Sequence, residues 1–149
     1  MTYQLVEVTE ARDWADFHAI RRVELFEAKG RFGIYNDRHP DDYADFAHPY
    51  LLKQDGRAQG TTRLDLFGQG RAAIRLVAIK AAEQGRGHGR VLEQMVAERA
   101  RGFGVDTLLV NAAPEAVGFY ERTGWERFDW DPAELVNIAG ACIQMRKLL

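Results

Sequence analysis

The chain has 149 residues, of which 46% are hydrophobic and 28% charged, so it can bury the core of one globular domain, which we place at residues 1–149. Its 20 lysine and arginine residues stand against 22 aspartate and glutamate residues, and the resulting net charge of -2 argues against a nucleic-acid partner. Cys142 is the only cysteine, which excludes an internal disulfide and a multi-cysteine metal site.

Hydropathy gives no sign of a membrane. The first ten residues mix polar with apolar side chains, and no run of 18 apolar residues occurs, so neither a signal peptide nor a membrane span is predicted. The four histidines show no metal-ligand spacing. We therefore expect a cytoplasmic protein without a membrane partner and without a metal.

The first half of the chain predicts strands around one helix. Residues 3–8 read as a strand, and Thr9 is a plausible N-cap for a helix that runs to about Ala28 and is closed by Gly30. Residues 31–47 are irregular. The acidic and aromatic side chains there would suit a cationic amine, or they belong equally well to a solvated loop with its aromatics packed underneath. Strands at 48–54 and 58–67 flank Asp55-Gly56, a two-residue hairpin turn.

The second half alternates strands with helices. Strands are expected at 72–80, 107–110, 125–130 and 143–147, and helices at 90–101 and from Pro114 to a stop at Gly124. Asn111 follows the second of these strands, and Cys142 is expected to be a small buried hydrophobe in the last strand-like run. This order predicts a mixed sheet covered by helices.

Every second residue from 85 to 89 is glycine in the turn between the strand at 72–80 and the helix at 90–101, where residues 84–89 read Gln-Gly-Arg-Gly-His-Gly. Glycines allow backbone amides to approach a ligand closely, and the free N–H groups of a helix start favour phosphate oxygens. Arg86 and Arg90 add positive charge. The turn is therefore either a pyrophosphate cradle or an ordinary glycine-rich connection.

Other phosphate motifs do not fit this spacing. A dinucleotide motif G-x-G-x-x-G would need glycine at Arg90 or Leu92, and a P-loop would need Gly-Lys-Ser/Thr, which does not occur. The spacing Q-x-x-G-x-G resembles the acetyl-CoA pyrophosphate signature of the GNAT superfamily of N-acetyltransferases. Two further segments resemble that family, namely Val77-Ala78-Ile79 before the turn and residues 116–125, which look like A-x-x-F-Y-x-x-x-G-F.

The resemblance implies a GNAT fold of class α/β (α+β mixed), with a central, mostly antiparallel sheet of about six to seven strands, a splayed parallel pair and about four flanking helices. It also implies acetyl-CoA as cosubstrate. The residues that it places around the cofactor are Val77, Ile79, Gln84, Gly85, Arg86, Gly87, His88, Gly89, Arg90, Asn111, Phe119 and Arg122. Asn111 could equally be a turn residue, and Arg122 a solvated helix charge.

Tyr120 is the candidate catalytic residue. Attack of an amine on a thioester expels a thiolate, and a phenol with a pKa of about 10 can donate a proton to a thiolate whose conjugate thiol has a pKa of about 8.5. Without the resemblance, a tyrosine at this position reads equally well as a core aromatic. Glu24, Asp65 and His18 are conceivable bases, but the sequence assigns none of them.

The implied function is acetyl transfer from acetyl-CoA to a primary amine, expected to belong to a small molecule, by direct attack in a ternary complex. Acetylation of a protein N-terminus or lysine, and a non-catalytic acyl-CoA-binding module, remain open alternatives. A homodimer through residues 125–130 or 143–149 is also conceivable.

Overall fold

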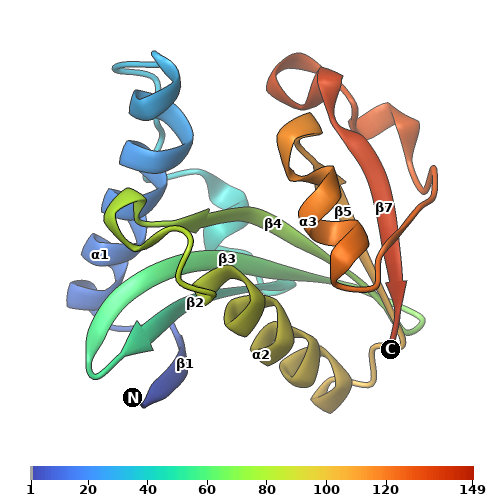
Figure 1. Cartoon of the computed structure of the whole chain (residues 1–149), viewed down its shortest axis with the longest axis horizontal. Coiled ribbons are helices and arrows are strands. Elements are labelled where there is room, and N and C mark those ends of the chain that lie inside the picture. Colours follow the sequence, from blue (N-terminus) through green and yellow to red (C-terminus); the bar gives the residue numbers. More distant parts are fainter. Residues whose placement is uncertain (1) are drawn as a thin grey trace.

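The computed structural model describes residues 2–149, in which seven strands form one sheet with helices on both faces (Figure 1). The strands are β1 (Tyr3–Glu7), β2 (Ala47–Gln54), β3 (Arg57–Gly68), β4 (Arg71–Ile79), β5 (Thr107–Ala112), β6 (Glu126–Arg127) and β7 (Ile143–Leu148). Their spatial order is β1-β2-β3-β4-β5-β7-β6, and only β4 and β5 pair in parallel. The expected mixed, mostly antiparallel sheet is confirmed.

Three α-helices flank the sheet: α1 (Ala11–Arg21), α2 (His88–Gly102) and α3 (Val117–Arg122). The expectation of about four helices was therefore slightly high, because residues 31–47 form only a short 3-10 turn at Pro40–Tyr43. The first helix begins after Glu10 rather than Thr9 and continues beyond α1 as a π-turn and a 3-10 turn. Gly30 ends it in the left-handed region with φ 76°, as predicted.

Turn chemistry explains the β2–β3 hairpin. Asp55 and Gly56 have φ values of 52° and 81°, and positive φ at both central residues is what a two-residue type I′ turn requires. Their conformation confirms the predicted hairpin.

The strand expected at 125–130 is shorter than predicted. Only β6 pairs with β7, because the backbone amides of Trp130 and Asp131 both donate to the side-chain oxygen of Gln144 and draw the chain into a loop. The following residues form 3-10 turns at Pro132–Glu134 and Asn137–Ala141. Cys142 precedes β7 and is half-buried, so the expectation of a buried cysteine was wrong.

Alternation along the strands builds one core on each face of the sheet. Leu52 of β2 packs in the core that contains Leu92 and Val96 of α2, whereas its neighbour Leu51 packs with Phe17 and Ile20 of α1. Val117 and Tyr120 of α3 belong to the same core as α2. Helices α2 and α3 therefore cover one face, and α1 covers the other.

The parallel pair separates halfway along β4. Pairing with β5 runs from Arg71 opposite Thr107 to Ile74 opposite Val110 and then stops, although β4 continues to Ile79. A bulge follows the last pair, since the register against β3 shifts there and Leu76 takes a positive φ of 54°. Figure 1 shows the result as a V, with β4 leaning toward α1 and β5 toward α3 and β7.

Candidate functional site

A narrow and mostly apolar crevice lies between β4, α2 and α3. Its lining residues are Thr62, Ile74, Val77, Gly89, Leu92, Glu93, Val96, Phe119 and Tyr120. Four of the predicted site residues, Val77, Gly89, Phe119 and Tyr120, thus meet in one place although they come from three elements. The crevice begins beside the point at which β4 and β5 separate, because Ile74 is the last residue of β4 that pairs with β5.

Beyond the bulge, no strand within residues 2–149 pairs with β4 on the side of β5. Ala78 lies opposite Thr61, and the Lys80 amide donates to the Gln59 carbonyl at 3.0 Å, so these residues face β3. Backbone groups alternate along a strand, and those of Val77 and Ile79 therefore point into the gap of the V, where the Ile79 carbonyl already accepts a hydrogen bond from the Gln84 side chain. An extended ligand with amide groups could pair with this edge as an extra strand would.

The turn before α2 presents a row of open amides. The N–H groups from Gly85 to Arg90 have no backbone acceptor within residues 2–149, and the first amide bonded to this turn is that of Val91, which donates to the Gly87 carbonyl at 3.2 Å. Gly85 and Gly87 have φ values of 79° and 83°, a conformation that glycine adopts without penalty. Consecutive open amides at a helix start form an anion site.

Side chains fasten this turn to the body of the protein. His88, only 2% exposed, has its Nδ1 atom 2.9 Å from the Tyr3 hydroxyl and its Nε2 atom 3.3 Å from a Glu83 carboxylate oxygen. The Gln84 amide donates to the Ile79 carbonyl at 3.0 Å. Among the predicted site residues, Gln84 and His88 therefore use their side chains to hold the turn.

Positive charge around the turn is exposed. The Arg86 guanidinium lies 3.3 Å from Glu83, and its side chain remains largely exposed. Arg90 is exposed on the first turn of α2 and makes no ion pair within the described residues 2–149. Both side chains are available to an anion bound at the open amides.

Tyr120 places a phenol in the crevice. Its side chain is buried, its ring meets those of Phe119 and Trp125 edge to face, and its hydroxyl has no hydrogen-bond partner among residues 2–149. Burial, and then the nearby Glu93 carboxylate, raises the pKa of Tyr120 far above its ordinary value. The phenol is therefore protonated throughout the physiological pH range and can act as a donor.

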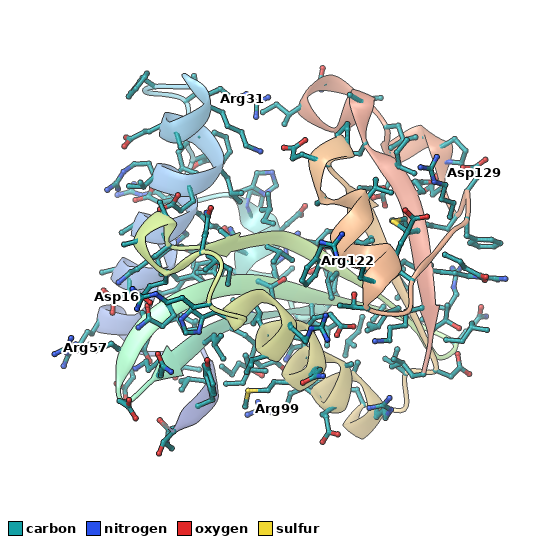
Figure 2. The ribbon with its side chains drawn as sticks, viewed as in Figure 1. Asp16, Arg31, Arg57, Arg99, Arg122 and Asp129 are labelled. Atoms are coloured by element: carbon teal, nitrogen blue, oxygen red, sulfur yellow. The ribbon has the colours of Figure 1, made fainter. Side chains whose placement is uncertain are left out.

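Two predicted residues lie apart from this group. The Asn111 amide donates to Glu134 and its oxygen accepts from Gln144, both at 2.9 Å, so the Asn111 side chain fastens β5 to the loop before β7. Arg122 is exposed on α3 (Figure 2), where one guanidinium nitrogen lies 3.1 Å from the position that a Cβ on Gly118 would occupy. Phe119, in contrast, packs beside Gly89.

The three candidate bases are all engaged. Glu24 accepts a hydrogen bond from the Ala81 amide at 2.9 Å, and Asp65 binds the guanidinium groups of Arg63 and Arg75. His18 lies between the hydroxyls of Tyr35 and Tyr43, at 2.5 and 3.1 Å. Burial, and then the charge of Arg21, lowers the pKa of His18, so its imidazole is neutral at physiological pH.

An ion-pair network that sequence reasoning missed crosses the face of the sheet under α1. Arg21 and Arg63 both bind the buried carboxylate of Asp42, Arg63 also binds Asp65, and Arg75 joins Asp65 to Glu134. Asp42 is thus neutralised by two guanidinium groups. Its charge is not available to attract a cationic amine, which removes part of the reason for expecting one.

The sequence pattern does not predict this ion-pair network. Arg63 and Asp65 alternate with leucines along β3, as charged residues do on a solvated strand. Glu93 carried a clearer signal, because it stands between Leu92 and Val96 within an apolar helical stripe.

The part of the chain that the structure describes contains neither a cluster of metal-ligating side chains nor a membrane-spanning helix. Within residues 2–149, no three acidic, histidine or cysteine side chains come together as a metal site. None of the helices in the same range has the length and apolar character needed to cross a membrane.

The sequence is similar to known proteins over most of its length. Residues 10–125 match the family model described as the acetyltransferase (GNAT) family. A stretch of 49 residues is 39% identical to glucosamine 6-phosphate N-acetyltransferase 1 of Oryza sativa subsp. japonica. That stretch covers 33% of this chain and 30% of the rice enzyme, so the chain matches less than a third of its relative's length.

Solved structures extend the likeness to the whole chain. The ribosomal-protein-S18-alanine N-acetyltransferase of Escherichia coli superposes with a TM-score of 0.74 at 16% identity, over 99% of this chain and 94% of that one. The PaiA N-acetyltransferase of Thermoplasma acidophilum, solved in complex with coenzyme A, gives 0.74 at 13% identity over 100% of both chains. At these identities the structures establish the fold, and because the family model spans most of the sequence, the chain belongs to the acetyltransferase (GNAT) family.

Proposed function

We propose that this protein is an acetyl-CoA-dependent N-acetyltransferase that acetylates the primary amine of a small molecule. The observation that carries the proposal is the alignment of three features along one path. The open amides of residues 85–90 lie at one end, the unpaired edge of β4 follows, and the phenol of Tyr120 lies in the adjoining crevice.

Each part of the path suits one part of acetyl-CoA. The glycine turn would bind the pyrophosphate through backbone N–H groups, with Arg86 and Arg90 adding charge. The backbone of Val77 and the N–H group of Ile79 would pair with the amides of the pantetheine arm, since the Ile79 carbonyl already accepts from Gln84. The apolar crevice walls would cover the methylene groups of the arm. The coenzyme A bound in the Thermoplasma structure supports this choice of cosubstrate.

The chemical step follows from the position of Tyr120. A neutral amine attacks the thioester carbonyl, a carbon–nitrogen bond forms, the carbon–sulfur bond breaks, and the sulfur takes the phenolic proton. The amine nitrogen releases one proton to solvent, and the phenolate takes one proton back from solvent, which restores the acid. Burial raises the pKa of Tyr120, but it also disfavours a thiolate in the same crevice. Because donor and acceptor shift in the same direction, transfer of the proton remains feasible.

The acceptor would enter from the other face of the V, where Arg75, Glu134 and Asn111 lie just beyond the splay. A small amine is favoured by the stretch shared with the rice enzyme, whose name specifies an amino sugar phosphate. The Escherichia coli neighbour acts on a protein alanine, which keeps protein acetylation as the second candidate. The non-catalytic binding module is the third.

A thiol-release assay separates these candidates. Acetyl-CoA is incubated with pooled primary amines in one series and with peptides in another, and free CoA is measured. Release that depends on small amines supports the proposal, whereas release only with peptides favours the second candidate. Calorimetric binding of CoA with no release in either series would identify a binding module and refute the enzymatic role.

Dimerisation is a separate proposal. Strand β7 pairs with β5 along its whole length, and β6 covers only Met145 and Arg146 on its other side. The Phe128 amide also donates to the Gln144 carbonyl at 3.0 Å, so the part of that edge without a strand partner among residues 2–149 is Lys147 and Leu148, which could pair with a second copy. Sedimentation at several concentrations tests it, since a constant monomer mass would exclude the dimer.

A further inference from the structure

Glu93 is a buried carboxylate in the wall of the crevice that Tyr120 also lines. One of its oxygens, Oε1, accepts two hydrogen bonds, from the Trp125 indole N–H at 3.2 Å and from the Lys147 ammonium group at 2.7 Å. These contacts join α2, the turn after α3, and β7. A carboxylate at this depth needs such partners, because burial without them would be costly.

Trp125 connects Glu93 to the candidate acid. The indole is 4% exposed, and its ring centroid lies 5.3 Å from that of Tyr120 at an interplanar angle of 70°. Edge-to-face contact of this kind restricts how both rings can move. With Phe119 on its other side, the Tyr120 ring is held between two aromatic neighbours.

The second oxygen of Glu93 has no hydrogen-bond partner within residues 2–149. The charges around Tyr120 on the elements packed against it are Glu93 on α2 and, bound to Glu93, Lys147 on β7; Arg122 and Glu121 lie on its own helix and are exposed. The Glu93 charge acts on the phenol directly, since after burial it is the other cause that raises the pKa of Tyr120.

We propose that Glu93 is a positioning residue for Tyr120: by fixing the Trp125 indole, it sets where the phenolic hydroxyl lies in the crevice. The inference rests on the proposed function, because it gives Glu93 a role only if Tyr120 protonates the leaving thiolate. An aliphatic side chain would fill the same stripe of α2 but would leave the indole N–H without its acceptor.

The test compares Glu93→Ala with Glu93→Gln, each in the wild-type and the Tyr120→Phe background. Alanine removes the acceptor, whereas the glutamine oxygen can still accept from Trp125 and Lys147. Glu98→Ala is the matched control, because Glu98 lies on the same helix with an 80% exposed side chain. Trp125→Phe, which keeps a ring and loses the N–H, is made as well in case Glu93→Ala does not fold.

Misplacement of a catalytic group by about 1 Å costs about 100-fold in rate, so we expect Glu93→Ala to lower kcat by about tenfold or more. Glu93→Gln should restore most of that loss, Trp125→Phe should lower kcat in the same direction, and the KM for acetyl-CoA should not change. In the Tyr120→Phe background, neither Glu93→Ala nor Trp125→Phe should lower kcat further.

Three results would overturn the positioning role: an equal loss of kcat in both backgrounds, no rescue by glutamine, or an unchanged kcat in folded Glu93→Ala and Trp125→Phe. A fully active Tyr120→Phe would instead remove the acid role of Tyr120 and the inference with it. Absence of acetyl transfer by the wild type would refute the proposed function itself. The failure of the inference and that of the function are thus distinguishable.

Discussion

Gly87→Ala should damage cofactor binding through backbone conformation alone. Gly87 is the N-cap of α2 with φ 83°, and no atom lies within 4 Å of the position that an added Cβ would occupy. The new methyl group therefore meets no obstacle, but an L-residue in the left-handed region costs about 1–2 kcal/mol. The turn can relieve this strain by rotating its peptide units, which re-aims the open amides.

The effect on acetyl-CoA can be estimated from the hydrogen bonds at risk. A bond from an amide to a charged oxygen contributes about 1.5–3 kcal/mol, and about 1.4 kcal/mol corresponds to tenfold in affinity. Loss of one such bond should raise the dissociation constant for acetyl-CoA by about 10- to 100-fold. Isothermal titration calorimetry measures it directly, and steady-state kinetics should show a higher KM.

Gly104→Ala is the matched control. Gly104 has φ 81° and equally open surroundings, but it follows the opposite end of α2. Both variants should lose about 1–2 kcal/mol of folding free energy in urea titrations, and only Gly87→Ala should bind acetyl-CoA more weakly. Equal affinities for acetyl-CoA in the two variants would refute the assignment of the glycine turn as the pyrophosphate site.

Three further predictions concern single side chains. Tyr120→Phe should lower kcat by about 10²- to 10⁴-fold without changing the KM for acetyl-CoA, and an unchanged kcat in a reaction limited by chemistry would contradict the acid role. Asp42→Asn should cost about 3–5 kcal/mol in urea unfolding, because it leaves the buried Arg21 guanidinium without an anionic partner and leaves Arg63 with Asp65 alone. The exposed Asp41→Asn should stay within about 0.5 kcal/mol, and equal losses in the two variants would contradict this account. The pKa of His18 is lowered in the folded protein, so the unfolded chain binds the proton more readily, and the free energy of unfolding should fall as the pH drops below about 6.5. In urea titrations at several pH values, His18→Gln should make this dependence on pH weaker. An unchanged dependence on pH would exclude His18 as its source.

Local sequence signals predicted the elements whose geometry depends on particular residue types. Asp55-Gly56 takes the positive φ values of a type I′ turn, and Gly85 and Gly87 take those that open the amides before α2. At each of these positions the residue type itself decides which backbone conformations are accessible, so the prediction required no knowledge of distant contacts.

Features that depend on distant contacts could not be predicted. Leu76 adopts φ 54° at the bulge of β4, and no glycine marks the position, because the register against β3 imposes the conformation. The strand expected at 125–130 was cut short by Gln144, whose side chain binds backbone amides more than ten residues away. Propensity gives no information on such a partner.

The candidate site divides in the same way. The motif predicted the cradle and Tyr120. Glu93 was visible as a charge within the apolar stripe of α2, but its partners, Trp125 and Lys147, could not be predicted because they come from elsewhere in the chain. The hydrogen bond from Asn111 to Glu134 could not be predicted from the sequence either. Residues that contact a ligand follow local motifs more closely than the residues that position them.

The most direct test of acetyl transfer is a stoichiometry measurement with acetyl-CoA and a responsive primary amine. Free CoA is followed with a thiol reagent, and the acceptor is followed by mass spectrometry in the same samples. The proposed function predicts one acetylated amine for each CoA released, in wild-type protein and at a much lower rate in Tyr120→Phe. CoA release without an acetylated amine, or at equal rates in both proteins, would contradict it.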